Sequence, residues 1–231
     1  MDNRGLKENL KKQITHMRNY SLFHVYKFIR FYLGLVLVMS SCQKSINKSC
    51  PCQGFTFYEE ASDSINYYWF PSGWMGSLSS ITCTENWIEN PHSGLTCIRI
   101  TYNTDNYTLW AGIYWLNNNS WNGPGINVYE TFRIPYTRQL KITFWCRGET
   151  GGETVQFKIG GVSGAEDSII LPVESSWIKL TKTWSKYEID LSGQDLSNLV
   201  GGFCWVVNNV HNPSFNNIIL YIDDINYETS N

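Results

Sequence analysis

The sequence contains no apolar run long enough to cross a bilayer, no long segment with helical periodicity and none of the common hydrolase motifs. Its longest leader-type apolar run, residues 31–39, falls short of the roughly 20 residues that a transmembrane helix needs. Neither G-x-S-x-G nor H-E-x-x-H occurs, and no C-x-x-C pair or His/Cys cluster has zinc-site spacing. These absences argue against a helical fold and against the enzymes that those motifs mark.

Charge is also scarce, because only 16% of the residues are Asp, Glu, Lys or Arg. Residues 43–231 hold 11 Lys plus Arg and 18 Asp plus Glu, a net charge of about −7. Affinity for nucleic acid rests on clustered Lys and Arg, so this acidic segment predicts no nucleic-acid partner. Aromatic residues are abundant instead, at 15% with ten Trp, and we expect some of these Trp side chains to contact a ligand.

The N-terminal segment has the pattern of an export signal. Residues 31–39 follow several basic residues and precede the sequence S-S-C, which ends at Cys42. A positive region, a short apolar region and small residues form a secretory signal, and the small-small-Cys ending resembles a bacterial lipobox. We expect a signal peptide over residues 1–41, starting at Met1 or Met17. Lipid on Cys42 would then anchor the exported protein to a bacterial membrane, at the cell surface or in the periplasm. A plain signal peptide cleaved nearby and an uncleaved anchor are the alternatives.

Six further cysteines follow Cys42, and export would place them under oxidising conditions. Cys83 and Cys97 flank a compact polar loop. A bridge there would close a loop of about 15 residues and stabilise the fold by roughly 3 kcal/mol on the chain-entropy model. We therefore expect a disulfide between Cys83 and Cys97. Cys146 and Cys204 lie in apolar runs and are expected to be buried thiols.

Short strand patterns separated by turn residues follow a polar linker at residues 42–53. Residues 140–147 and 154–159 alternate apolar and polar side chains on either side of the turn G-E-T-G-G-E. Residues 203–207 are almost wholly apolar, as in a strand that is covered on both faces. The pattern predicts one all-β domain over residues 54–231, either a β-sandwich or a barrel.

One of these strands carries a pattern with a catalytic precedent. Glu188 and Asp190 form E-x-D, the beginning of the E-x-D-x-x-E signature of jelly-roll glucanases. In that signature, alternate carboxylates on one strand face serve as nucleophile and acid. The third carboxylate position is Gly193 in this sequence. We therefore expect solvated carboxylates on a strand rather than an active site.

Three motifs carry a resemblance to a known family. They are P-H-S-G-L-T-C-I-R-I-T-Y at residues 91–102, W-S-K-Y-E-I-D-L-S-G at 184–193, and Y-I-D-D-I at 221–225. In this order they resemble carbohydrate-binding modules of the galactose-binding-like fold, nearest the family-11-like clostridial β-glucan binders. The resemblance covers residues 55–227. It implies an all-β jelly-roll β-sandwich of two antiparallel sheets that binds polysaccharide without cleaving it.

The same resemblance implies a structural calcium ion. In such modules calcium is held by an acidic residue of the first strand, by the H-S-G loop and by an Asp of the last strand. Calcium favours six to eight hard oxygen ligands, carboxylates and carbonyls together. The alternative is a set of solvated carboxylates at strand ends. The candidate ligands are Glu59, Glu60, His92, Gly94, Asp223 and Asp224.

The ligand-binding face follows from alternation, because a sugar stacks on aromatic rings and its hydroxyls need polar partners. Trp145 and Arg147 lie opposite the apolar face of their strand. On residues 109–116, either Trp110 and Tyr114 or the alternate set around Trp115 point outward. The candidate ligand-binding residues are Trp110, Tyr114, Trp121, Trp145, Arg147, Gln156 and Lys158.

Two other functions remain compatible with the sequence. The first is a glycan-active enzyme, a lyase or a glycosidase without a recognisable motif. The second is an interaction protein whose aromatic face docks another surface protein. We therefore expect a β-sandwich that binds polysaccharide and that contacts the membrane only through its lipid anchor.

Overall fold

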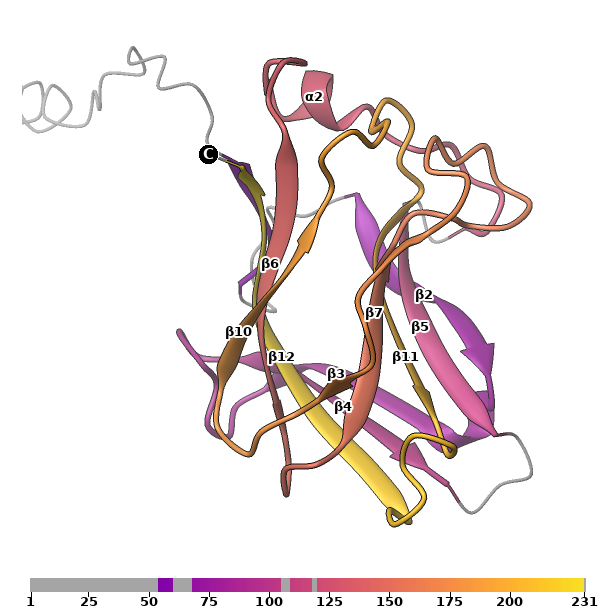
Figure 1. Ribbon diagram of the computed structural model, residues 1–231, viewed down its shortest axis with the longest axis vertical. Helices are drawn as coiled ribbons and strands as arrows, with labels where there is room; N and C mark the ends of the chain where they lie inside the picture. The colour runs from indigo at the N-terminus through magenta and orange to yellow at the C-terminus, as the bar shows by residue number, and fades with distance from the viewer. Residues whose placement is uncertain (1–53, 60–67, 105–108, 118–119, 231) are drawn as a thin grey trace, which may run out of the picture. The chain divides into compact units, whose positions relative to one another are not determined.

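The computed structural model describes residues 54–59, 68–104, 109–117 and 120–230 (Figure 1). The expected signal peptide, linker, lipidated Cys42 and candidate ligand Glu60 lie outside these residues. No helix in the described ranges is long and apolar enough to span a membrane. The elements, in chain order, are β1 (Gly54–Tyr58), β2 (Trp69–Gly76), η1 (Leu78–Ser80), β3 (Ile81–Trp87), β4 (Cys97–Asn103), β5 (Trp110–Asn117), α2 (Val128–Thr131), β6 (Leu140–Gly148), β7 (Thr154–Ile159), β8 (Val173–Glu174), β9 (Ile178–Lys179), β10 (Ser185–Asp190), β11 (Gly201–Asn208) and β12 (Asn217–Thr229).

The strands form two antiparallel sheets that pack face to face (Figure 1). Sheet A has the order β10-β6-β12-β4-β3, with β1 paired to the far half of β12. Sheet B has the order β2-β5-β11-β7-β8, with β9 also paired to β7. The predicted all-β jelly-roll β-sandwich is therefore confirmed. In the described residues, helical structure is limited to the 3-10 turn η1 and the short α2, whose N-terminus Asn127 caps by accepting the backbone N–H of Glu130.

The core lies between the sheets and follows the alternation of the strands. On β6, Ile142, Phe144 and Cys146 point into it, as predicted. On β11, Phe203 and Trp205 fill the opposite side, and both are fully buried. Successive strand residues point to opposite faces, so each sheet also has an outer face, which is where ligands have access.

The expected disulfide between Cys83 and Cys97 does not form, and both residues are thiols. The register of β3 with β4 explains why. Cys83 is paired with Ile100 and points toward the core, whereas Cys97 is paired with Trp87 and precedes the core residue Ile98. The two thiols therefore point to opposite sides of sheet A. Spacing along the chain could not reveal this, because register decides it.

Candidate functional site

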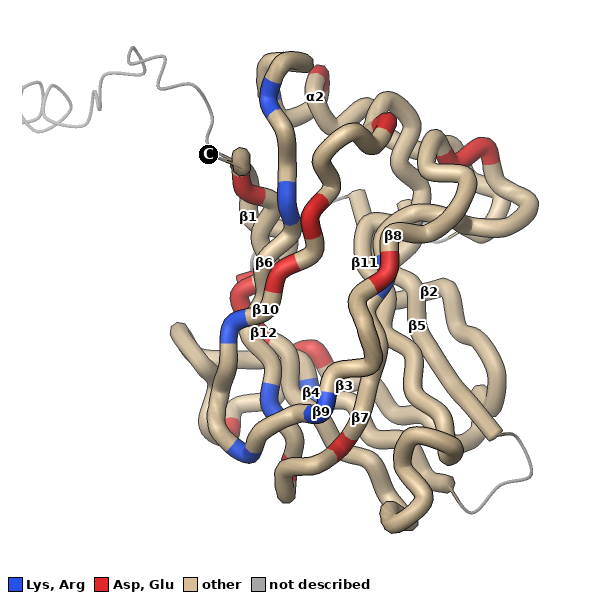
Figure 2. The backbone as a smooth tube through the Cα atoms, viewed as in Figure 1, with Lys and Arg blue, Asp and Glu red and all other residues tan. Residues whose placement is uncertain are grey.

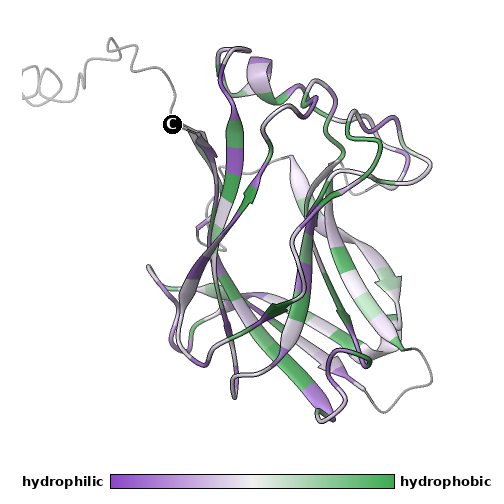
Figure 3. Cartoon of the chain, viewed as in Figure 1, coloured by the Kyte–Doolittle hydropathy of each residue, from purple (hydrophilic) through white to green (hydrophobic). Residues whose placement is uncertain are grey.

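The three strands β2, β5 and β11 of sheet B contain no charged residue. Figure 2 shows this asymmetry, with charges concentrated on β6, β10 and β12 and an uncharged tube along β2 and β5. Figure 3 shows apolar positions on the same strands. Both faces of these three strands are therefore suited to apolar contact, although only their inner face belongs to the main core.

The outer face of sheet B carries the even-numbered residues of β5. Ala111, Ile113 and Trp115 belong to the main core, so Trp110 and Tyr114 point outward and the open question of alternation is decided. Trp110 is 41% exposed. Gly112 lies between Trp110 and Tyr114. A side chain there would press on the carbonyl oxygen of Trp205 at 2.7 Å and on Met75 at 3.0 Å. Because Gly112 has no side chain, the surface between the rings of Trp110 and Tyr114 stays open.

Tyr114 is on the predicted face but it is only 5% exposed. Its hydroxyl donates to the carbonyl of Gly160 at 2.9 Å, and burial raises its pKa above the ordinary value. Trp121 packs edge-on against it, with ring centroids 6.1 Å apart. Tyr114 therefore supports the half-buried Trp121 ring, and little of its own side chain is open to the direct ligand contact that was expected.

Polar side chains of β7 border this aromatic row. Lys158 pairs with Glu174 at 2.5 Å. Gln156 donates to Glu174 at 3.2 Å and to the carbonyl of Ser175 at 3.0 Å. Both β7 residues point outward as predicted, because their neighbours Val155, Phe157 and Ile159 are core residues. The Lys158–Glu174 pair leaves this border with donors and acceptors but little net charge.

The structure adds one aromatic pair to this face that was not predicted. Trp177 stacks on His211 with ring centroids 4.0 Å apart. Ile178 pairs with Val155 in β9 and packs against the core, so the preceding Trp177 points outward beside Gln156. In the sequence, the alternation of Ile178 with Leu180 was the signal that could have placed Trp177 on the outer face. It was too short to be decisive, since β9 has two residues. We refer to Trp110, Trp121, Trp177, Gln156 and Lys158 as the platform.

Trp145 and Arg147 do not join the platform, because they lie on the outer face of sheet A, on the other side of the sandwich. Arg147 is only 7% exposed. Its guanidinium lies 3.7 Å from the ring centroid of Tyr221 and 5.2 Å from that of Trp184. The rings of Tyr221 and Trp184 hold Arg147 in place, and its expected contact with ligand stays a prediction.

Trp145 is half-buried and its ring stacks on His92 at 3.8 Å. The H-S-G loop, which the resemblance expects to share a calcium ion with the last strand, contacts that strand directly at this point. The backbone N–H of His92 donates to Asp223 at 2.8 Å, and that of Ser93 at 3.3 Å. On Asp224, His92 Nδ1 contacts one carboxylate oxygen at 2.6 Å and Ser93 Oγ donates to the other at 2.7 Å.

A bulge in β12 makes this arrangement possible. The register with β6 shifts between Asp223 and Asn226, and Asp224 adopts a left-handed backbone with φ of 47°. Asp and Asn tolerate this conformation better than most residues. Two consecutive carboxylates can then face the same loop, which a regular strand would not allow.

Comparison with solved structures identifies the architecture. No family model and no curated protein sequence matches the chain. A crystal structure of a family 30 carbohydrate-binding module matches with a TM-score of 0.53 at 12% identity, covering 77% of this chain and 88% of that one. A family 30 module of a cellulosomal cellulase from Clostridium thermocellum matches with a TM-score of 0.51 at 11% identity, over 77% of this chain and 98% of that one.

The chain has the fold of carbohydrate-binding modules. A further family 30 crystal structure is covered over 99% of its length with a TM-score of 0.52 at 11% identity. The β-sandwich therefore covers the whole of that fold. At these identities the likeness concerns the fold, so the platform and the Asp223–Asp224 pair must be judged by their own chemistry.

The carboxylates of Asp223 and Asp224 fit the implied calcium only in part. All four carboxylate oxygens of Asp223 and Asp224 already have a partner in the protein. Three of them contact groups of the H-S-G loop, and the fourth accepts the backbone N–H of Asp224. Burial first, and then repulsion from Asp224, raise the pKa of Asp223 to about 6. Within the described ranges, no three His, Cys, Asp or Glu side chains are arranged so that they could hold a metal ion. Glu59 is exposed after the end of β1.

Proposed function

We propose that this chain binds an uncharged polysaccharide on the platform of sheet B and does not cleave it. The observation that carries the proposal is the combination of uncharged strands β2, β5 and β11 with outward Trp110, Trp121 and Trp177. An aromatic ring offers an apolar surface to the apolar face of a sugar. Along β5, Trp110 and the Tyr114 that supports Trp121 are four residues apart, roughly 13 Å at the usual rise, which favours a ligand of several sugar units.

The polar border of the platform supports an uncharged ligand. Lys158 is neutralised by Glu174, and Gln156 presents an amide next to that pair. Sugar hydroxyls both donate and accept, so they match this mixture of amide, ammonium and carboxylate groups. Within the platform the cation is Lys158, which Glu174 already pairs, and this favours a neutral ligand over an acidic glycan.

The finer parts of the proposal are a β-glucan ligand, a structural calcium and a lipid anchor. The β-glucan and the calcium follow from the motifs at residues 91–102, 184–193 and 221–225. For calcium, the oxygens of Asp223 and Asp224 supply the chemistry, with Glu59 or Glu60 and the loop from His92 to Gly94 as partners. Bound there, calcium would neutralise the carboxylate pair. The lipid anchor on Cys42 would hold an exported module at a bacterial membrane.

A glycan microarray tests the proposal most directly. We expect the pure protein to bind neutral polysaccharides on the array. In a separate assay, it should release no reducing sugar from them on prolonged incubation. Release of reducing ends would instead indicate a lyase or glycosidase. Silence across the array, together with a surface protein that co-purifies with this chain, would favour a protein partner and contradict polysaccharide binding.

A further inference from the structure

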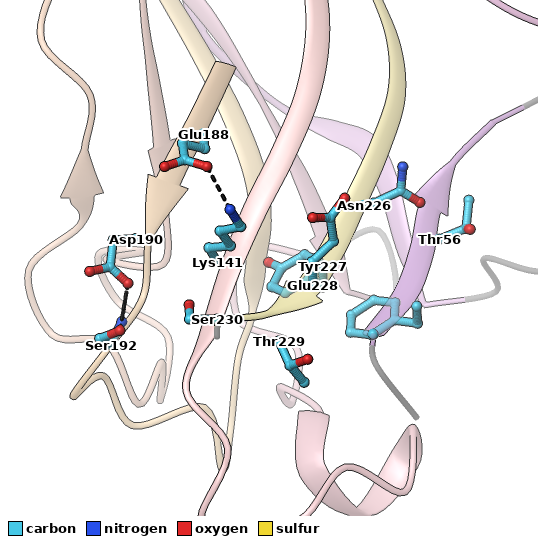
Figure 4. A pocket seen from close by; sticks show the side chains of 12 residues that line it. Thr56, Lys141, Glu188, Asp190, Ser192, Asn226, Tyr227, Glu228, Thr229 and Ser230 are labelled. Atoms are coloured by element: carbon cyan, nitrogen blue, oxygen red, sulfur yellow. Dashed lines mark hydrogen bonds and ion pairs between the residues drawn. The ribbon is translucent and has the colours of Figure 1, made fainter. Parts of the chain in front are cut away.

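A broad trough lies on the outer face of sheet A, opposite the platform, with a volume of about 1040 Å³. It crosses four strands, β10, β6, β12 and β1 (Figure 4). The strand register aligns its polar residues in two neighbouring rows. The first row holds Asp190, Lys141 and Glu228, and the second holds Glu188, Asn226 and Thr56.

Small residues give the trough its depth. Gly54 is paired with Glu228 at the β1 end of the first row, and an added side chain there would meet the carbonyl oxygen of Tyr227 at 1.9 Å. In the second row, the short Thr143 lies between Glu188 and Asn226. The longer carboxylate and ammonium side chains therefore stand around these short residues, which form the floor of the trough. Figure 4 shows the side chains of Glu188, Asp190 and Lys141.

Donors and acceptors alternate across this surface. Lys141 donates to Glu188 at 2.7 Å, and Thr143 and Lys186 donate to Glu228 at 2.8 and 3.3 Å. Hydrogen bonds from the Ser192 hydroxyl and N–H hold the pKa of Asp190 below its usual value. Burial raises the pKa of Glu228, but bonds from Thr143 and Lys186 outweigh it and leave this pKa lowered as well. Both groups are therefore charged acceptors at neutral pH.

We propose that this trough is a second carbohydrate-binding site, separate from the platform and open to a short polyhydroxylated ligand. Neighbouring hydroxyls of a sugar ring donate to carboxylates and accept from ammonium and amide groups, which is the alternation that Glu188, Lys141 and Asn226 present. Trp145 lies in the next row, paired with Lys186 and Asp223, and adds a half-buried aromatic ring beside the polar floor.

The two sites differ in the way they hold sugar. The platform offers mainly rings and the trough mainly charged hydrogen-bonding groups, so the platform suits stacking along a chain and the trough suits hydroxyl recognition. Because the sites occupy opposite faces of the sandwich, one molecule could hold two glycan chains. Two sites on one chain also raise the apparent affinity for a polymer when both can engage it.

Calorimetric titration of the whole exported chain with cellohexaose, laminarihexaose, xylohexaose and mannohexaose tests this inference. We expect two ligand molecules per chain with the hexasaccharide that binds best. Glu188→Gln combined with Asp190→Asn should weaken one of the two events at least tenfold. Trp110→Ala should weaken only the other. The matched control is Glu166→Gln with Asp195→Asn, two exposed carboxylates outside both sites, and it should leave both events unchanged.

Amide chemical shifts then locate each event. Binding at the trough should move the resonances of Lys141 and Asn226, and binding at the platform those of Gly112 and Val206. If the wild type shows a single binding event and the trough variant leaves it unchanged, the second site is refuted and the proposed binding at the platform stands. A single event lost in the trough variant, with Trp110→Ala silent, would support the trough and refute the platform. Absence of binding by all four hexasaccharides would overturn both.

Discussion

Trp110 is the residue on which the platform can be tested most cleanly. It begins β5 and is 41% exposed. Its removal leaves no cavity in the core. We expect Trp110→Ala to weaken polysaccharide binding by about 1–3 kcal/mol, by analogy with the loss of base stacking on aromatic residues. The free energy of unfolding should change by less than about 0.5 kcal/mol, as for surface substitutions in general. Affinity electrophoresis and urea unfolding measure the two quantities.

Tyr136→Ala is the matched control for Trp110, because Tyr136 is also an exposed aromatic residue and lies outside the platform. Its tilted ring contact with Tyr129, with centroids 4.8 Å apart, is local. Affinity should be unchanged in this variant. Equal losses of affinity in both variants, or unchanged affinity in Trp110→Ala, would contradict the placement of the ligand on sheet B.

At the scale of elements, a row of alternating aromatic rings and guanidinium groups, called the ladder below, stabilises the outer face of sheet A. Arg99 lies over Trp87 at 4.6 Å, and Arg147 lies over Tyr221 at 3.7 Å. The register of β12 places Tyr221 opposite Arg99 on one side and opposite Arg147 on the other. The ladder therefore ties β4, β12 and β6 together on the side away from the core.

Arg147→Met tests this structural role. The methionine keeps most of the apolar length and removes the charge from between the two rings. A desolvated cation–π contact contributes about 2 kcal/mol, so we expect the free energy of unfolding in urea to fall by roughly that amount. Polysaccharide affinity should not change. Arg138→Met, an exposed arginine in the preceding loop, should be neutral in both respects. A loss of affinity without a loss of stability would return Arg147 to the ligand-binding residues.

At the scale of the whole molecule, the H-S-G loop before β4 is joined to the last strand through Asp223 and Asp224. If calcium binds there, it stabilises only the folded state, by about 2.7 kcal/mol at a hundredfold excess over Kd. EDTA should then lower the melting temperature by about 5–10 °C. Asp223→Ala should melt as low as the chelated wild type and gain nothing from added calcium, whereas Asp190→Asn should respond like the wild type.

The pKa of Asp223 sets the pH range for this effect. In the metal-free protein that pKa is about 6, above its unfolded value of 3.8. Protonation of Asp223 therefore favours folding as the pH falls through 6. Calcium needs the ionised carboxylate, so its stabilisation should shrink below pH 6. An unchanged melting temperature in EDTA at pH 7.5, with no calcium found by elemental analysis, would contradict the proposed calcium site.

Export also concerns the whole molecule. If Cys42 is the lipidated residue, Cys42→Ser should accumulate as a soluble or unprocessed species instead of a membrane-associated one. Palmitate labelling in the bacterial host measures this directly, and Cys50→Ser is the matched control, because it removes a neighbouring thiol and leaves the S-S-C sequence intact. Normal labelling of Cys42→Ser would contradict the lipoprotein assignment and leave a plain signal peptide.

The sequence alone determined the strands and the direction of many side chains. Alternation on residues 140–147 placed Phe144 in the core and Trp145 outside it, as the structure confirms. The motifs also implied that the H-S-G loop and Asp223 or Asp224 share a calcium ion. The loop and both carboxylates do lie together, and the ion itself stays a prediction. These successes share a cause, since side-chain direction in a strand depends on neighbouring residues, and the motif order reflects a recurring fold.

Tertiary structure alone decided which outward residues share a face and which stay accessible. Register put Cys83 and Cys97 on opposite sides of sheet A. Strand order put Trp145 on one side of the sandwich and Trp110 on the other. Packing buried Tyr114 under Trp121 and enclosed Arg147 between rings. Each outcome depends on pairing and coverage between segments distant in the chain, and local alternation carries no information about those contacts.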